Sequence, residues 1–299
     1  PVIESAGGHV ALAANYVNLG NQSIDTIRQT AQTASGGSGE LEVSARHVDL
    51  TGHFALQGFK SAKIDSDGDV RLVGIVKTPP NDDEGVVTKT KPPEGSFKVQ
   101  GDLQVHARQV VATTLSQYTL DVSNLARFTR HDTPSPVLSA GSEITVKAKT
   151  IALEGAPTAP LPGGALKAPL GSITLAADDI TLGEGSIISV SGENQLIPFG
   201  GTDKTGREYY FSIDGQGIAR QGVEGQPQKR IELAGKNVEF KAGATLDVSG
   251  GGDLLAYEFI QGLGGSTDVL SPGVSPNTYA ILSDYQGRSN GGSGWLRIM

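Results

Sequence analysis

Apolar residues recur at fixed offsets along most of this chain. Six segments share the pattern and can be aligned from their first residues, which are Gly8, Gly39, Gly101, Ser142, Gly171 and Lys229. Each segment has large apolar residues at its third and fifth positions, such as Val10 and Leu12 in the first segment. A small residue follows two positions later, as Ala14 does. A second apolar pair follows in five of the segments, three and five positions after the small residue, as in Val17 and Leu19.

This spacing predicts strands that turn corners. Alternate apolar positions are typical of a strand with one buried face. The step of three residues after the small residue breaks that alternation, so the chain must turn if both halves are to face one core. A third strand is visible after Gly185 and after Gly243, each of which is followed by alternating apolar residues. Three short strands in each repeat predict an all-β fold, specifically a right-handed parallel β-helix with loop insertions. A β-sandwich is the alternative, although its strands need not share the same offsets.

The repeats are unevenly spaced, which predicts where loops leave the repeated structure. Insertions in a stacked repeat map to its outside. We expect residues 1–250 to form the repeats, with loop insertions near 78–95, 115–139 and 195–228, and residues 251–299 to form an irregular C-terminal extension of the same rod. A partial copy can be aligned from Gly68, which is followed by Asp-Val-Arg-Leu.

Composition narrows the class of protein and of partner. The 37% hydrophobic content argues against a disordered chain, and 5% aromatic and 19% charged residues with 41 Gly are unlike a helical enzyme. The net charge of −8 argues against nucleic acid as a partner. The absence of Cys excludes thiolate chemistry. No apolar run long enough to span a membrane occurs in the sequence, so we expect no membrane insertion. We also expect no cofactor.

Two phrases near the end of the chain resemble a known family. Gly243-Ala-Thr-Leu-Asp-Val-Ser-Gly, the following Gly-Gly-Asp-Leu-Leu-Ala-Tyr-Glu-Phe and the repeats resemble filamentous haemagglutinin-type exoproteins of the two-partner secretion pathway. The resemblance covers most of the chain and implies a shaft segment of a secreted bacterial cell-surface protein. It implies export by an outer-membrane transporter, and roles in adhesion, biofilm formation or contact-dependent interactions. The expected partner on a host or bacterial surface is a glycan or a protein.

An acidic run offers a candidate metal site. Asp65, Asp67 and Asp69 alternate with Ser66 and Gly68, as carboxylates do in some calcium loops. An EF-hand would require Glu at the twelfth position of the loop, where Val76 lies instead. The alternative interpretation is a solvated turn before the next strand.

Acidic residues also recur at the second position of successive repeats. Aligning the copies places Glu40, Asp69, Asp102 and Glu143 in one column. Stacked like charges repel one another, so such a ladder would favour a cation or a calcium-dependent polysaccharide lyase site. The alternative is that loops or intervening strands separate these carboxylates and that each faces solvent.

Aromatic residues mark a candidate contact site. Tyr209, Tyr210 and Phe211 lie in the predicted 195–228 loop and could stack on a sugar or contact a protein, or could simply pack the loop onto the rod. The histidines are scattered and match no metal-binding or catalytic motif. We therefore expect a non-catalytic structural or adhesive segment. The alternatives are a carbohydrate-active β-helix enzyme and a receptor-binding segment of a contact-dependent toxin-delivery protein.

Overall fold

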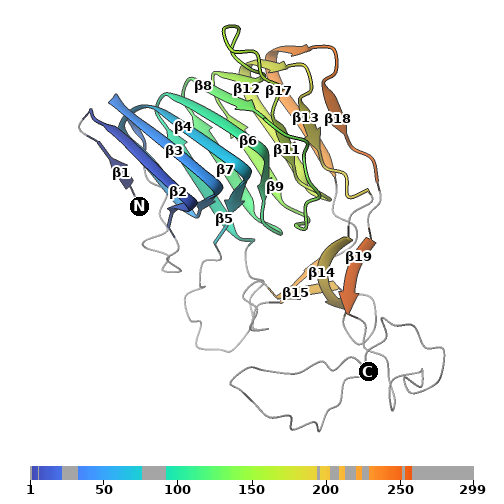
Figure 1. The fold of residues 1–299 in the computed structure, drawn as a ribbon. Coiled ribbons are helices and arrows are strands. Elements are labelled where there is room, and N and C mark those ends of the chain that lie inside the picture. The colour runs from blue at the N-terminus through green and yellow to red at the C-terminus, as the bar shows by residue number, and fades with distance from the viewer. Residues whose placement is uncertain are drawn as a thin grey trace, which may run out of the picture.

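The computed structural model describes residues 2–5, 7–21, 33–75, 92–193, 196–202, 209–212, 220–223, 229–250 and 253–257. Every regular element in these residues is a strand, so the prediction of an all-β fold is confirmed for the described part of the chain (Figure 1). In the same residues, no helix is long and apolar enough to cross a membrane.

Fifteen strands belong to one large sheet and four to a small one. The large sheet contains β1 (Val2–Glu4), β2 (His9–Gly20), β3 (Ser35–Thr51), β4 (His53–Val73), β5 (Glu94–Val99), β6 (Asp102–Ala112), β7 (Gln117–Val122), β8 (Leu125–Thr129), β9 (Glu143–Lys147), β10 (Thr150–Leu153), β11 (Ala165–Lys167), β12 (Ser172–Leu182), β13 (Ile187–Ser189), β17 (Arg230–Phe240) and β18 (Thr245–Asp247). The small sheet contains β14 (Leu196–Thr202), β15 (Tyr209–Ser212), β16 (Arg220–Val223) and β19 (Asp253–Tyr257).

The repeats pair with one another in the register that the offsets predict. In the parallel pair of β2 and β3, Val10 lies opposite Leu41, Leu12 opposite Val43 and Val17 opposite Val48. Strands β12 and β17 match in the same way, from Ser172 opposite Arg230 to Leu182 opposite Phe240. Equivalent side chains therefore stack on one another, and the aligned offsets are confirmed as strand register.

The pairing of the large sheet closes on itself. Eight parallel strands form a ring in the order β4-β6-β8-β10-β12-β9-β7-β5, and β5 pairs back to β4. The ring closes because β4 and β12 are long enough to pair with two different neighbours. In β4, residues 53–55 pair with β5 and residues 61–72 pair with β6. In β12, residues 172–176 pair with β9 and residues 179–182 pair with β10.

The prediction of a right-handed parallel β-helix is therefore wrong. The sequence pattern predicted an open solenoid, whereas the pairing forms a closed ring of eight parallel strands to which further strands are attached. Offsets within a repeat determine which faces are buried and which residues stack. They do not determine which strand pairs with each half of a long strand.

One further detail of the repeat alignment needs correction. The copy next to β3 does not begin at Gly68, because Glu40 lies opposite Ser61 and Val48 lies opposite Val70. Strands β7 and β8 lie within the segment that the sequence predicts as a loop near 115–139. The segment expected as a loop near 195–228 contains β14, β15 and β16, while most of 78–95 lies outside the described residues.

The interior of the ring is filled by side chains from the alternate positions of its strands. Phe54 of β4 and Phe97 of β5 stack with ring centroids 4.5 Å apart, and Tyr118 of β7 is buried beside this layer of strands. Ile144 of β9 and Ile173 of β12 continue the apolar layer in direct register. Burial of these large side chains is the main favourable term for the fold.

Glycine is required where the third strand of two repeats begins. Gly185 has φ +70° before β13, and Gly243 has φ +81° before β18. Side chains rarely adopt this left-handed backbone, which explains the glycine shared by the two phrases. The strands that follow pair in parallel, with Ile188 opposite Leu246.

The outermost strands of the large sheet expose apolar positions that are buried further inside. Leu12 is exposed on β2, and Val238 and Phe240 are exposed on β17. The equivalent positions Val43 and Leu182 are fully buried. The difference arises because β2 and β17 each have a partner strand on one side only among the described residues.

We predict that Phe97→Ala lowers the free energy of unfolding by about 3–5 kcal/mol, because it removes a fully buried ring and leaves a cavity beside Phe54. Chemical denaturation followed by circular dichroism measures the change. Leu138→Ala is the control, since Leu138 is 66% exposed and its loss should change stability by less than about 0.5 kcal/mol. Equal effects of the two substitutions would contradict this account of the core.

Candidate binding groove

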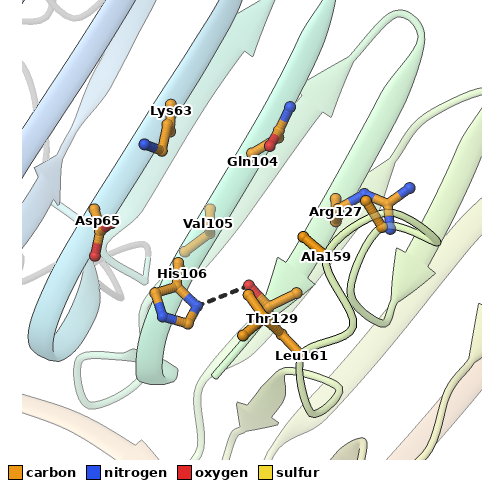
Figure 2. A pocket seen from close by; sticks show the side chains of 10 residues that line it. Lys63, Asp65, Gln104, Val105, His106, Arg127, Thr129, Ala159 and Leu161 are labelled. Atoms are coloured by element: carbon orange, nitrogen blue, oxygen red, sulfur yellow. Dashed lines mark hydrogen bonds between the residues drawn. The ribbon is translucent and has the colours of Figure 1, made fainter. Parts of the chain in front are cut away.

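A groove of about 350 Å³ lies on the outer face of β4, β6 and β8 (Figure 2). We call it the β4–β6–β8 groove. Its lining residues are Lys63, Asp65, Gln104, Val105, His106, Arg127, Thr129, Ala156, Ala159 and Leu161. Strands from three different repeats therefore form its floor, and the segment after β10 forms one wall.

Strand register places the polar side chains of the groove in two rows. Ala62 and Ile64 of β4 point into the core, so Lys63 and Asp65 point outward. In the first row, Lys63 lies opposite Gln104, and Gln104 lies opposite Arg127.

The second row is formed in the same way one step along the strands. Asp65 lies opposite His106, and His106 lies opposite Thr129. Because neighbouring strands are about 4.8 Å apart, each row spans about 10 Å of the surface.

A tight turn after β10 forms the wall. The Gly155 N–H donates to the carbonyl of Leu161 at 3.1 Å, and the Ala159 N–H donates to the carbonyl of Ala156 at 2.9 Å. A side chain at Gly155 would collide with the backbone of Leu161, so the turn requires glycine at this position. The turn holds Leu161 at the edge of the groove with 44% of its surface exposed.

The two cations of the first row differ in how far they are neutralised. Lys63 Nζ donates to Glu42 Oε1 at 3.0 Å and so shares its charge with a carboxylate. Arg127 Nη1 donates to the carbonyl oxygen of Glu154 at 2.8 Å, which is a neutral partner. No carboxylate lies within ion-pairing distance of Arg127 in the part of the chain that the structure describes. Arg127 is therefore the less compensated positive charge of the groove.

His106 of the second row contacts Thr129 of β8 and His131 of the loop beyond β8. Its Nδ1 lies 2.9 Å from Thr129 Oγ1, and its ring centroid lies 5.2 Å from that of His131. Burial lowers the pKa of His106, and the neighbouring charges of His131 and Lys63 lower it further, whereas Asp65 opposes the shift. The imidazole is therefore predominantly neutral at neutral pH.

These residues can recognise a polar ligand with an anionic group. Arginine and lysine N–H groups donate to a carboxylate, and the arginine fork does so in a fixed geometry. Gln104, His106 and Asp65 can exchange hydrogen bonds with hydroxyl groups. Leu161 and Ala159 offer an apolar surface beside them.

The three carboxylates of the predicted calcium site are not brought together. Asp69 Oδ2 accepts a hydrogen bond from Gln109 Nε2 at 3.0 Å, and the carbonyl of Asp67 lies 2.9 Å from His131 Nε2. Asp65 instead lies in the β4–β6–β8 groove. Within the described ranges, no group of three His, Asp or Glu side chains could hold a metal ion. The structure thus gives the calcium hypothesis no support.

The predicted column of acids is interrupted by other residues. Ser61 of β4 separates Glu40 from Asp102. Glu40 pairs with Lys60 at 2.7 Å, and Asp102 accepts a hydrogen bond from Asn124. Glu143 lies opposite Gln117 and Ser172. The alternative in which intervening strands separate the acids is therefore confirmed.

The predicted aromatic contact residues lie in the small sheet. Tyr209, Tyr210 and Phe211 belong to β15, which pairs antiparallel with β14 and with β16. Their backbone is therefore part of a strand, and the described structure does not extend to their side chains.

Sequence reasoning missed the residues of the groove because two of its strands were not recognised as repeats. β8 contributes Arg127 and has only a short apolar alternation, Ala126 and Phe128. The copy in β4 contributes Lys63 but has one extra residue between its apolar pairs. The neighbours of His106 come from other strands, so the sequence does not reveal them.

A second polar cluster is structural. Asp49 of β3 is buried, and its carboxylate accepts two hydrogen bonds from Arg71, at 2.7 and 2.6 Å, and one from the Tyr16 hydroxyl at 2.8 Å. This geometry raises the pKa of Arg71, chiefly through the hydrogen bond to Asp49. Both oxygens of the Asp49 carboxylate accept hydrogen bonds from side chains of the neighbouring strands, so the cluster links β2, β3 and β4.

We predict that the stability of the protein falls as the pH falls from about 7.5 to about 5, in part because His106 must be protonated. Its pKa is lowered in the folded state, so unfolding takes up a proton at that site below its ordinary pKa of 6.5. Stability is then greatest above that pKa and is lost as the pH falls. Denaturation midpoints measured across this range should fall less steeply in His106→Asn. His47→Asn, at an exposed histidine, should retain the wild-type slope; a wild-type slope in His106→Asn would contradict the prediction.

Comparisons with protein-family models, with curated proteins and with solved structures find no match to this chain. The residues of the β4–β6–β8 groove and of the large sheet are therefore the basis for inferring a function.

Proposed function

We propose that this chain is a non-catalytic structural and adhesive segment of a large secreted bacterial surface protein, exported by two-partner secretion. One observation carries the proposal. Strands β2, β3, β4, β6, β8, β10, β12 and β17 pair in parallel in this order, so parallel strands are attached to the closed ring both at β4 and at β12. A packed ring that carries further parallel strands suits a structural segment of a larger surface protein.

The outer side chains of these strands also suit an exposed structural surface. Lys63 pairs with Glu42, Lys60 with Glu40 and Lys236 with Asp178, each across neighbouring strands. Exposed ion pairs of this kind contribute little to stability, but they keep the surface soluble and hinder pairing with wrong partners. The resemblance of the repeats to haemagglutinin-type exoproteins supports the same role.

Surface labelling tests the location. Antibodies raised against the folded chain should bind intact cells of the source organism, and protease added outside the cells should remove the signal. Deletion of the matching outer-membrane transporter should leave the protein inside. A chain that is labelled only after lysis, in cells with an intact transporter, would overturn the proposal.

An adhesion assay tests the activity. A non-adherent bacterium that displays this chain should attach to host or bacterial cells more than one that displays Phe97→Ala, which disrupts the packed core. The display level of both chains is measured on the same cells as the control. Attachment that is equal at equal display, with Phe97→Ala shown to be unfolded, would argue against an adhesive role for the folded structure.

A further inference from the structure

The first row of the β4–β6–β8 groove presents three donor side chains to a ligand. Lys63, Gln104 and Arg127 lie directly opposite one another on neighbouring strands. Their side chains emerge on one face of the sheet and line the same groove (Figure 2). The Lys63 ammonium is directed to Glu42 and the Arg127 guanidinium to the carbonyl of Glu154, so the row offers hydrogen-bond donors at separate points along its length.

The first row contains one cation that no carboxylate neutralises among the described residues. The protein has a net charge of −8 and Lys63 is paired with Glu42, which leaves Arg127 as the positive charge that is open to a ligand. Arg127 spends one donor on the neutral carbonyl of Glu154 and retains the rest of its fork. A carboxylate ligand would supply the partner that the described residues do not.

The second row is suited to hydroxyl groups. Asp65 accepts hydrogen bonds, and neutral His106 can both donate and accept through its two ring nitrogens. Thr129 Oγ1 already contacts His106 Nδ1 and so fixes the orientation of the ring. A ligand that carries a carboxylate beside several hydroxyls matches both rows together.

The wall favours a ligand with an apolar face. Leu161 is 44% exposed at the edge of the groove although it is a large apolar residue. The C–H face of a pyranose ring can cover such a side chain while its hydroxyl groups reach the polar rows.

The strand pairing argues against an extended peptide. β6 pairs with β4 on one side and with β8 on the other, and β8 also pairs with β10. The backbone groups of the floor are therefore occupied, and a peptide cannot bind by adding a strand. Recognition must come from side chains, as it does for sugars.

We propose that the β4–β6–β8 groove binds a uronic-acid unit of an acidic polysaccharide. Arg127 binds the carboxylate, Gln104 and Lys63 donate to other oxygens of the ligand, and Asp65 and His106 bind hydroxyl groups. The proposal deepens the adhesive role and rests on it for the source of the ligand, which would be a polysaccharide on a cell surface.

Titration calorimetry with a galacturonate tetramer tests the groove, with a galactose tetramer as the neutral probe. The wild-type protein should bind the uronate and not the neutral sugar, and binding should weaken as salt is added. Arg127→Gln should weaken binding by about tenfold or more, because charge-assisted hydrogen bonds are lost. Lys63→Gln should weaken it by about threefold, because Glu42 already shares that charge.

The controls separate a lost contact from a lost fold. Arg127 also holds the turn through Glu154, whereas no contact joins Lys63 to that turn within the described residues. Lys63→Gln therefore tests a ligand contact of the groove without disturbing the wall. Lys147→Gln removes an exposed lysine on β9, away from the groove, and should bind as the wild type does. Thermal unfolding of every variant checks that the fold is intact.

Three outcomes would overturn the proposal. They are equal binding of the neutral and acidic tetramers, wild-type binding by both groove variants, and binding of inorganic phosphate or a polyglutamate peptide with none of the uronate. Each would leave the surface labelling and adhesion results intact, so failure here is distinct from failure of the surface role. Cleavage of the tetramer by the wild-type protein would support the groove and overturn the non-catalytic function.

Discussion

Parallel backbone pairing between equivalent positions of the repeats is the constraint on which the rest of this structure depends. Each buried strand must satisfy its N–H and C=O groups with neighbours on both sides. Strands β6 and β8 do so within the ring, with Leu103 opposite Ala126 and Val105 opposite Phe128. This register stacks like side chains on like, so the interior becomes one apolar column and the exterior becomes rows of polar residues. Where a partner strand is missing on one side, at β2 and β17, the same apolar positions become exposed.

The groove is a consequence of that register. No single repeat contains it, because Lys63, His106 and Arg127 come from three strands that are separated in the sequence. Pairing places them within two steps of one another, and the turn at Gly155 adds a wall that belongs to none of the three strands. A rigid sheet holds the side chains at fixed spacing, which is useful for recognising a ligand of regular shape. The cluster of Asp49, Arg71 and Tyr16 is built in the same way, but its groups satisfy one another and hold the sheet together.

The proposed roles use different parts of this arrangement. The proposed structural role depends on the packed ring and on the parallel strands that are attached to it. Binding depends on the outward positions, which can vary without disturbing the core because alternate residues point to opposite faces. His106 lines the groove, and its Nδ1 lies 2.9 Å from Thr129 Oγ1, while burial lowers the pKa of the ring.

The sequence by itself determined the all-β class, the buried positions and the register of the clearest repeats, because alternating burial leaves a direct periodic signal. Val10, Leu41, Ile173 and Ile231 were all assigned to equivalent buried columns from their offsets alone. Only the tertiary structure decided how the strands close into a ring. Part of β4 pairs with β5 and part pairs with β6, and the sequence of β4 does not indicate which strand each part pairs with. The tertiary structure also determined which residues line the groove, because side chains from separate strands come together only when the strands pair. The supposed acid ladder of Glu40, Asp69 and Asp102 failed for the same reason: Ser61 lies between two of its members, and only pairing shows it.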